Sequence, residues 1–74
     1  MNEHGKVLVD NWLNDAAVKG RFTVENLYGQ LMAHYGVKDR AGFVIGRKQL
    51  SAYLASLGHA PKLSGGRYWV RIRT

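Results

Sequence analysis

The sequence predicts an α+β fold, with three short helices and a small antiparallel sheet of two or three strands. Three segments before residue 58 place apolar side chains at helical spacing, and residues 67–73 alternate apolar with polar side chains. The glycine-rich turn Ser64-Gly65-Gly66 precedes that last strand. A chain of 74 residues has room for one such unit, so residues 1–74 are assigned to a single domain.

The first helix is predicted over residues 6–18. Gly20 supplies a stop signal for it, and residues 1–5 are expected to fray because little there can be buried. The apolar side chains expected on its buried face are Leu8, Val9, Trp12, Leu13 and Ala16.

The second helix is predicted over residues 24–35, after a short segment, residues 21–23, that can add a third strand to the sheet. Thr23 is suited to cap this helix, and Glu25 in the first turn interacts favourably with the helix dipole. Gly36 ends it. The side chains expected to face the core are Val24, Leu27, Tyr28, Leu31 and Tyr35.

The third helix is predicted over residues 46–57. The corner before it, residues 43–45, is expected to be buried, although Phe43 could equally lie on the surface. The inward side of the helix is expected to consist of Leu50, Leu54 and Leu57, flanked by Tyr53.

The outward side of the third helix is small or cationic. Its members are Lys48, Ser51, Ala52, Ala55 and Ser56, with Arg47 at the edge. Small side chains let a helix enter a DNA major groove, which is about 12 Å wide. Small residues are also common on exposed helix faces that bind nothing, so this pattern alone does not separate the two interpretations.

Residues 59–73 are predicted to form a β-hairpin, with strands over 59–63 and 67–73. Pro61 lacks a donor N–H, which confines the first strand to an edge or gives it an irregular start. The side chains of the second strand that should face the core are Tyr68, Val70 and Ile72. Trp69 points the other way among arginines, where it either stacks on a guanidinium or covers the base of the hairpin.

The turn of the hairpin carries no bulky side chain. Backbone N–H groups around Gly65 and the hydroxyl of Ser64 can therefore come close to a phosphate. An ordinary glycine turn explains these residues equally well. The cations on either side, Lys62 and Arg67, favour the phosphate interpretation.

Positive charge is confined to the second half of the chain. Residues 1–39 contain five acids and four bases, whereas residues 40–74 contain seven bases and no acid, and the net charge is +6. A basic chain with a pI near 10.1 favours a polyanionic partner. A helix followed by a basic hairpin is the order in which a winged helix-turn-helix contacts DNA, so the sequence predicts that fold.

The pattern also resembles the C-terminal winged-helix domain of phage, plasmid and poxvirus-type primase-helicases. The residues that carry the resemblance are Trp12-Leu13, Leu27-Tyr28, Tyr35, the helix from Gly46 to Gly58 with its leucines, and Gly66-Arg67-Tyr68-Trp69-Val70-Arg71-Ile72. In that family the domain follows an AAA+ helicase and is thought to bind DNA. The chain departs from the family at Ile45-Gly46, where a serine cap is common, and it holds this domain alone.

Several classes of function are not expected. The sequence has no cysteine, its histidines are scattered, and no run of residues approaches the roughly 20 apolar positions of a membrane span. Residues 42–49 differ from a phosphate-binding loop in the glycine spacing and in having Gln49 where a Ser or Thr belongs. We therefore expect no catalysis, metal, cofactor, small-molecule ligand or membrane contact, and a cytoplasmic location.

The resulting prediction is a non-enzymatic domain that binds double-stranded DNA in the replication of a phage or mobile element. The predicted DNA-binding residues are Arg47, Lys48, Ser51, Ala52, Ala55, Lys62, Ser64, Gly65, Arg67 and Arg71. Three alternatives remain open: a module that docks a helicase or another replication protein, a small phage-type transcriptional regulator, and binding of single strands by stacking on Tyr68 or Trp69.

Overall fold

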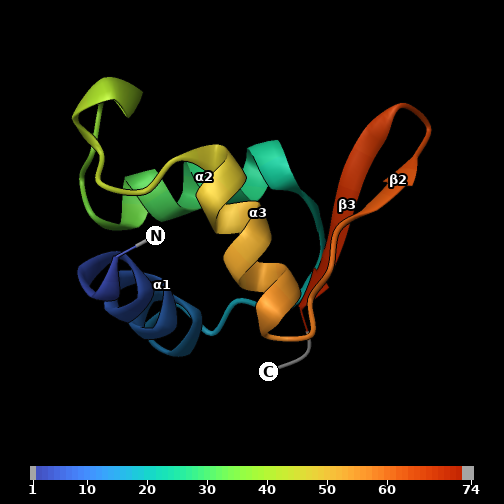
Figure 1. Ribbon diagram of the computed structural model, residues 1–74, viewed down its shortest axis with the longest axis horizontal. Coiled ribbons are helices and arrows are strands. Elements are labelled where there is room, and N and C mark those ends of the chain that lie inside the picture. Colours follow the sequence, from blue (N-terminus) through green and yellow to red (C-terminus); the bar gives the residue numbers. More distant parts are fainter. Residues whose placement is uncertain (1, 73–74) are drawn as a thin grey trace.

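The computed structural model describes residues 2–72, which form three α-helices and a three-stranded antiparallel sheet (Figure 1). In chain order the elements are α1 (Glu3–Asp15), β1 (Gly20–Thr23), α2 (Val24–His34), the 3-10 turn η1 (Arg40–Gly42), α3 (Arg47–Ser56), β2 (Lys62–Ser64) and β3 (Arg67–Ile72). The predicted α+β class is confirmed, and the arrangement is compatible with a winged-helix fold.

Helix α1 begins earlier and ends earlier than predicted. The side chain of Asn2 accepts a hydrogen bond of 2.8 Å from the backbone N–H of Gly5, and this cap starts the helix at Glu3. The expectation that residues 1–5 fray is therefore wrong for residues 3–5. Ala16 lies beyond the end of the helix and is exposed, so its predicted place in the core is also wrong.

Helix α2 follows its prediction closely. The hydroxyl of Thr23 accepts a hydrogen bond of 3.1 Å from the N–H of Asn26, which confirms the predicted cap. Gly36 has a φ of +67°, a left-handed conformation that glycine adopts without strain after the last helical turn. The predicted inward residues are buried except for Tyr35, which is half-buried: they are Val24, Leu27, Tyr28 and Leu31.

The sheet has the strand order β1-β3-β2 within the described residues. Strand β1 pairs with β3 from Gly20 opposite Ile72 to Thr23 opposite Trp69, so the predicted third strand is confirmed. Strand β2 begins at Lys62 instead of residue 59, because Pro61 cannot donate a ladder hydrogen bond. Residue 73 of the predicted hairpin lies outside the described residues.

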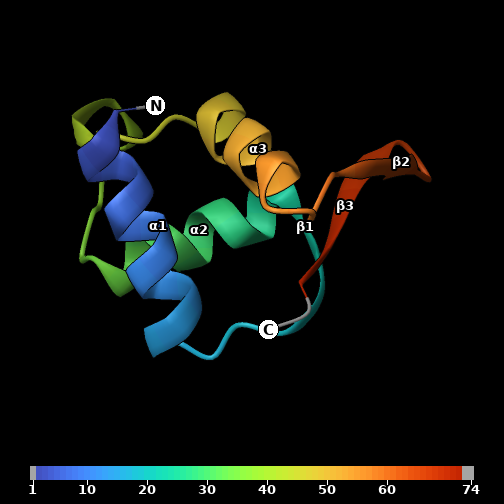
Figure 2. The same ribbon diagram turned by 60° about the horizontal axis from the view of Figure 1, so that its bottom comes forward.

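Gly65 and Gly66 connect β2 to β3 with φ angles of +59° and +77°. Two consecutive residues with positive φ define the type of tight turn whose twist matches that of a hairpin. The turn lies at the tip of the hairpin, which extends away from the helices, as Figure 2 shows.

The core lies where α2 meets the other elements. Helix α2 packs against α1, α3, β1 and β3. Leu50 and Leu54 of α3 are fully buried, which confirms them as the inward side of that helix. Complete burial of a leucine contributes roughly 1.5–3 kcal/mol relative to an exposed position. Phe43 is half-buried and packs against this core, which excludes the surface alternative for that residue.

Some residues predicted to be buried are exposed. Leu57 is 42% exposed because α3 ends at Ser56 and Leu57 is only its cap. Val44 is also 42% exposed, so only part of the corner at residues 43–45 is buried. Tyr68 is 57% exposed because it lies near the hairpin turn, away from the core.

Tyrosine hydroxyl groups join the elements. Tyr28 of α2 donates a buried hydrogen bond of 2.7 Å to the carbonyl of Ile45, just before α3. Tyr53 of α3 donates 2.8 Å to the carboxylate of Asp10 on α1, and this hydrogen bond raises the pKa of Tyr53. These bonds fix the position of α3 at both of its ends.

We predict that Tyr28→Phe lowers the free energy of unfolding by about 1–2 kcal/mol, because it leaves the buried carbonyl of Ile45 without its donor. Tyr68→Phe is the matched control, because the same hydroxyl is removed from an exposed ring. Urea denaturation followed by circular dichroism measures both changes. Equal stability losses in the two variants would contradict the role given to the Tyr28 bond.

Candidate nucleic-acid interface

The exposed side of α3 is opposite to its buried leucines. Lys48, Ala52 and Ala55 are exposed, as predicted, and Ser51 is half-buried. The helix begins at Arg47 with Gly46 as its cap, and the side chain of Gln49 accepts a hydrogen bond of 3.0 Å from the N–H of Gly46. This bond is one half of a capping box; the other half is missing because Gly46 has no side chain that could accept a hydrogen bond from the first turn of α3.

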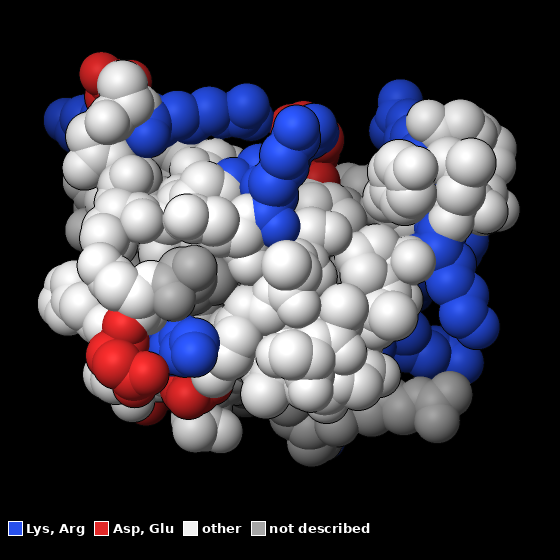
Figure 3. All heavy atoms as spheres, in the orientation of Figure 1, with Lys and Arg blue, Asp and Glu red and all other residues white. Residues whose placement is uncertain are grey.

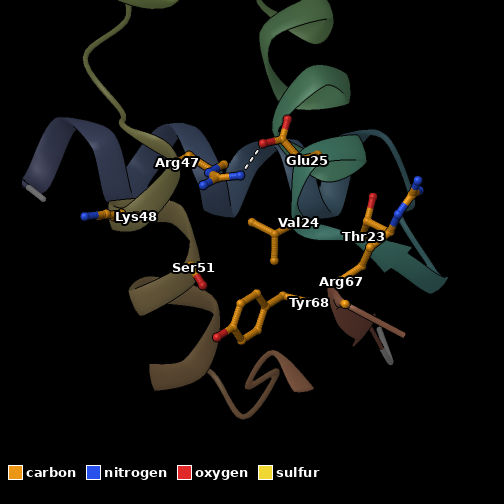
Figure 4. Close-up of a pocket in the computed structure, with 9 residues that line it drawn as sticks. Thr23, Val24, Glu25, Arg47, Lys48, Ser51, Arg67 and Tyr68 are labelled. Atoms are coloured by element: carbon orange, nitrogen blue, oxygen red, sulfur yellow. Dashed lines mark hydrogen bonds and ion pairs between the residues drawn. The ribbon is translucent and has the colours of Figure 1, made fainter. Parts of the chain in front are cut away.

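A groove of about 650 Å³ separates the first two turns of α3 from the hairpin (Figure 4). It brings together four of the predicted DNA-binding residues from two elements: Arg47, Lys48, Ser51 and Arg67. The side chain of Tyr68 points from β3 toward α3, beside Ser51. The groove therefore joins the predicted recognition helix to the hairpin in one concave surface.

An acidic residue, Glu25, also lines this groove. Its carboxylate forms ion pairs with Arg47 and, at 3.1 Å, with Arg40 (Figure 4 shows the first). The hydrogen bond from Arg40 is the main reason why the pKa of Glu25 is lowered, and the positive charge of Arg47 adds to the effect. Arg47 was predicted as a phosphate contact, but its charge is already paired in the free protein.

Four of the predicted residues lie on the surface of the sheet that faces away from the helices: Lys62, Ser64, Arg67 and Arg71. Val70 and Ile72 are buried against the helices, so alternate positions of β3 point away from them. Arg71 lies on that outer face, and so does Lys62, which is paired with Trp69 across the strands. Ser64 lies opposite Arg67, so both are on the outer face, where Arg67 also borders the groove, and Gly65 is exposed at the turn. The structure thus divides the predicted site between the groove and the outer face.

Sequence reasoning did not identify Arg21 as a site residue. Its guanidinium lies over the ring of Trp69, 4.2 Å from the ring centroid, and the indole N–H donates a hydrogen bond of 3.2 Å to the carbonyl of Ser64. Stacking on a guanidinium, one of the two alternatives given for Trp69, therefore occurs, with a partner from β1. Only the pairing of β1 with β3 reveals this contact, because 48 positions separate the two residues in sequence.

Charge is distributed unevenly on the face that carries α3. Figure 3 shows Lys and Arg side chains along the upper rim and on the hairpin side, and a group of Asp and Glu side chains at the lower left, over α1. A Lys or Arg side chain also extends over the start of α3, and the middle of this face below it, over the later part of α3 and the loop after it, is uncharged. A ligand on this face would meet cations at its margins and small neutral side chains at its centre.

The described residues contain no group of three or more His, Cys, Asp or Glu side chains that could hold a metal ion. Among the helices of residues 2–72, none combines the length and the apolar character that crossing a membrane requires. The comparisons with known proteins gave no match to a family model, to a curated protein or to a solved structure.

We predict that the side-chain carboxyl of Glu25 titrates below its ordinary pKa of 4.5, because Arg40 and Arg47 stabilise the charged form. Since the folded-state pKa is lowered, the pairing favours the folded state above about pH 4.5 and is lost as the pH falls through the folded-state value. Carbon-detected NMR of the carboxyl group measures this titration. In Arg40→Gln/Arg47→Gln the midpoint should return toward 4.5, and an unchanged midpoint would contradict the pairing.

Proposed function

We propose that this chain is a non-enzymatic, winged-helix domain that binds double-stranded DNA. Helix α3 would lie in the major groove, and the turn of the hairpin would follow the adjacent backbone. The observation that supports this proposal is the convergence of α3 and the hairpin on one groove, with the exposed cations Lys48 and Arg67 on its two sides.

The small side chains of α3 determine how DNA would be read. Ser51, Ala52 and Ala55 allow the helix backbone to come close to the base edges but offer few long hydrogen-bonding groups. Specificity between sequences is therefore weak for a single copy of the domain. Backbone N–H groups at Gly65 and the hydroxyl of Ser64 add contacts to phosphate without side-chain bulk.

The salt dependence of binding follows from the number of cations that contact phosphate. Lys48 and Arg67 alone give a slope of log K against log salt of about −1.8, at roughly −0.9 per contact. If Arg40 and Arg47 leave Glu25 to contact phosphate as well, the slope steepens to about −3.6. The wild-type slope should lie between these values.

We predict that Lys48→Glu and Arg67→Glu each weaken binding to duplex DNA by about tenfold or more, because each reverses a charge beside phosphate. Fluorescence anisotropy with a labelled duplex, titrated with salt, measures the loss. Lys38→Glu is the matched control, since it makes the same charge change at an exposed position in the loop between α2 and η1. That loop is far from the hairpin (Figure 1).

The outcome that would overturn this proposal is weak duplex binding that does not respond to salt and is equal in all three charge variants. Circular dichroism must show that each variant is folded before its affinity is compared. A uniform loss in all three, the control included, would point to net charge alone and would also contradict a defined interface.

We predict that Glu25→Gln binds duplex DNA several-fold more tightly than the wild type, with a steeper salt slope. The substitution removes a negative charge from the groove and releases Arg40 and Arg47 for phosphate. Glu3→Gln is the control, since it removes an equal charge from the exposed first turn of α1. Equal affinity of the two variants would show that Glu25 lies outside the interface.

The role in replication rests on the resemblance to primase-helicase domains and is part of the same proposal. Such a role would place the domain inside a bacterial or host cell. A second candidate function, docking of a protein partner, is favoured by the cross-strand pair Leu63 and Tyr68, which are 63% and 57% exposed. Leu63→Ser would weaken such docking while leaving the cations for DNA in place.

A further inference from the structure

The outer face of the sheet, defined here as the side of β1, β2 and β3 that points away from the helices, carries cations around a single aromatic ring. Trp69 lies in the central strand, with Thr23 opposite it on β1 and Lys62 opposite it on β2. Arg71 and its cross-strand partner Arg21 occupy the next row on one side, and Arg67, opposite Ser64, occupies the row on the other side, where it also borders the groove. The described strands contain no Asp or Glu.

The aromatic ring on this face is held in a fixed orientation. The indole N–H of Trp69 donates a hydrogen bond to the carbonyl of Ser64 across the hairpin, and the guanidinium carbon of Arg21 lies over the ring, 4.2 Å from its centroid. Arg21 is exposed, so the side of its guanidinium that does not face the ring is open to solvent. Nucleic-acid bases stack on aromatic rings and on arginine planes alike.

The arginines on the outer face repel one another. Arg21 and Arg71 are direct cross-strand partners, and like charges in that position destabilise a sheet. No acid from the described strands compensates them. A polyanion bound along β3 would remove this repulsion.

We propose that the outer face of the sheet is a second binding surface, for a short stretch of single-stranded nucleic acid. A base stacks on the Arg21–Trp69 pair, and the neighbouring phosphates contact Arg71 and Lys62. Phosphate and an exposed base face are shared by DNA and RNA single strands, so the chemistry on this face accepts either.

A single strand fits this face better than a duplex does. In a duplex the planar faces of the bases are stacked on one another and cannot reach the Arg21–Trp69 pair, whereas an unpaired strand offers them freely. The outer face is also separate from α3, since the buried residues Val70 and Ile72 point to the helices from the same strand. Duplex and single strand can therefore be bound together.

The test is fluorescence anisotropy of labelled oligo(dT) and oligo(U), each measured alone and with saturating unlabelled duplex. We expect Arg21→Glu to weaken binding of single strands by about tenfold and to leave duplex affinity within about twofold. Lys48→Glu should do the reverse, and Lys38→Glu should change neither affinity. The two oligonucleotides show whether the face prefers DNA or RNA.

Tryptophan fluorescence provides a second readout that does not depend on charge. Trp12 is 1% exposed in the core, so quenching of emission by oligo(dT) reports on Trp69. Trp69→Phe should abolish the quenching. If that variant fails to fold, Arg21→Gln replaces it. Quenching by oligo(dT) should then be reduced, because loss of the guanidinium removes the stacking surface without adding a negative charge.

The outcomes separate this proposal from the duplex proposal. Displacement of oligo(dT) by duplex, with Lys48→Glu weakening both ligands equally, would overturn the second surface and leave duplex binding intact. Single-strand binding that is lost in Arg21→Glu, in a protein that does not bind duplex, would support the second surface and overturn the first. Absence of single-strand binding, or of Trp69 quenching, would overturn it directly.

Discussion

Burial of one side of α2 is the constraint on which the rest of the structure depends. Leu27 and Leu31 are fully buried, and α2 packs against α1, α3, β1 and β3. The side of α3 that faces α2 must bury Leu50 and Leu54 in this core. The rotation of α3 about its own axis is therefore fixed. The face that carries Lys48 and the alanines is outward as a consequence of packing, and the hairpin is positioned beside it by the burial of Val70.

The contacts of the charged residues depend on the folded topology more than on their order in the sequence. Glu25 is the second residue of α2, which begins directly after β1, and so lies at the junction of the sheet, α2 and α3, where it pairs with arginines from two later segments. The same strand sends Arg21 to the opposite side of the sheet, onto Trp69. Arg21 and Glu25, four positions apart in sequence, thus serve different surfaces: Glu25 pairs with arginines in the groove, and Arg21 lies over Trp69 on the outer face of the sheet.

Local sequence patterns were sufficient to predict the helices, the third strand and most of the core, because helical spacing and capping residues such as Thr23 act within a few positions. Errors occurred where tertiary structure decides exposure. Tyr68 alternates correctly with Val70 and points toward α3, but it borders an open groove and stays exposed, and Leu57 keeps helical spacing although the helix has ended. The ion pair of Glu25 with Arg47 joins positions 22 apart, so no local pattern could predict it.

The last strand of the described chain is also the middle strand of the sheet. During synthesis, β1 has no partner until β3 has left the ribosome, since its partners are residues 69–72. The helices can collapse on one another earlier, through contacts that are nearer in sequence. Both surfaces that carry the basic residues are therefore completed only when β3 pairs with β1 and β2. Before that pairing, a nascent chain exposes α3 without the hairpin beside it.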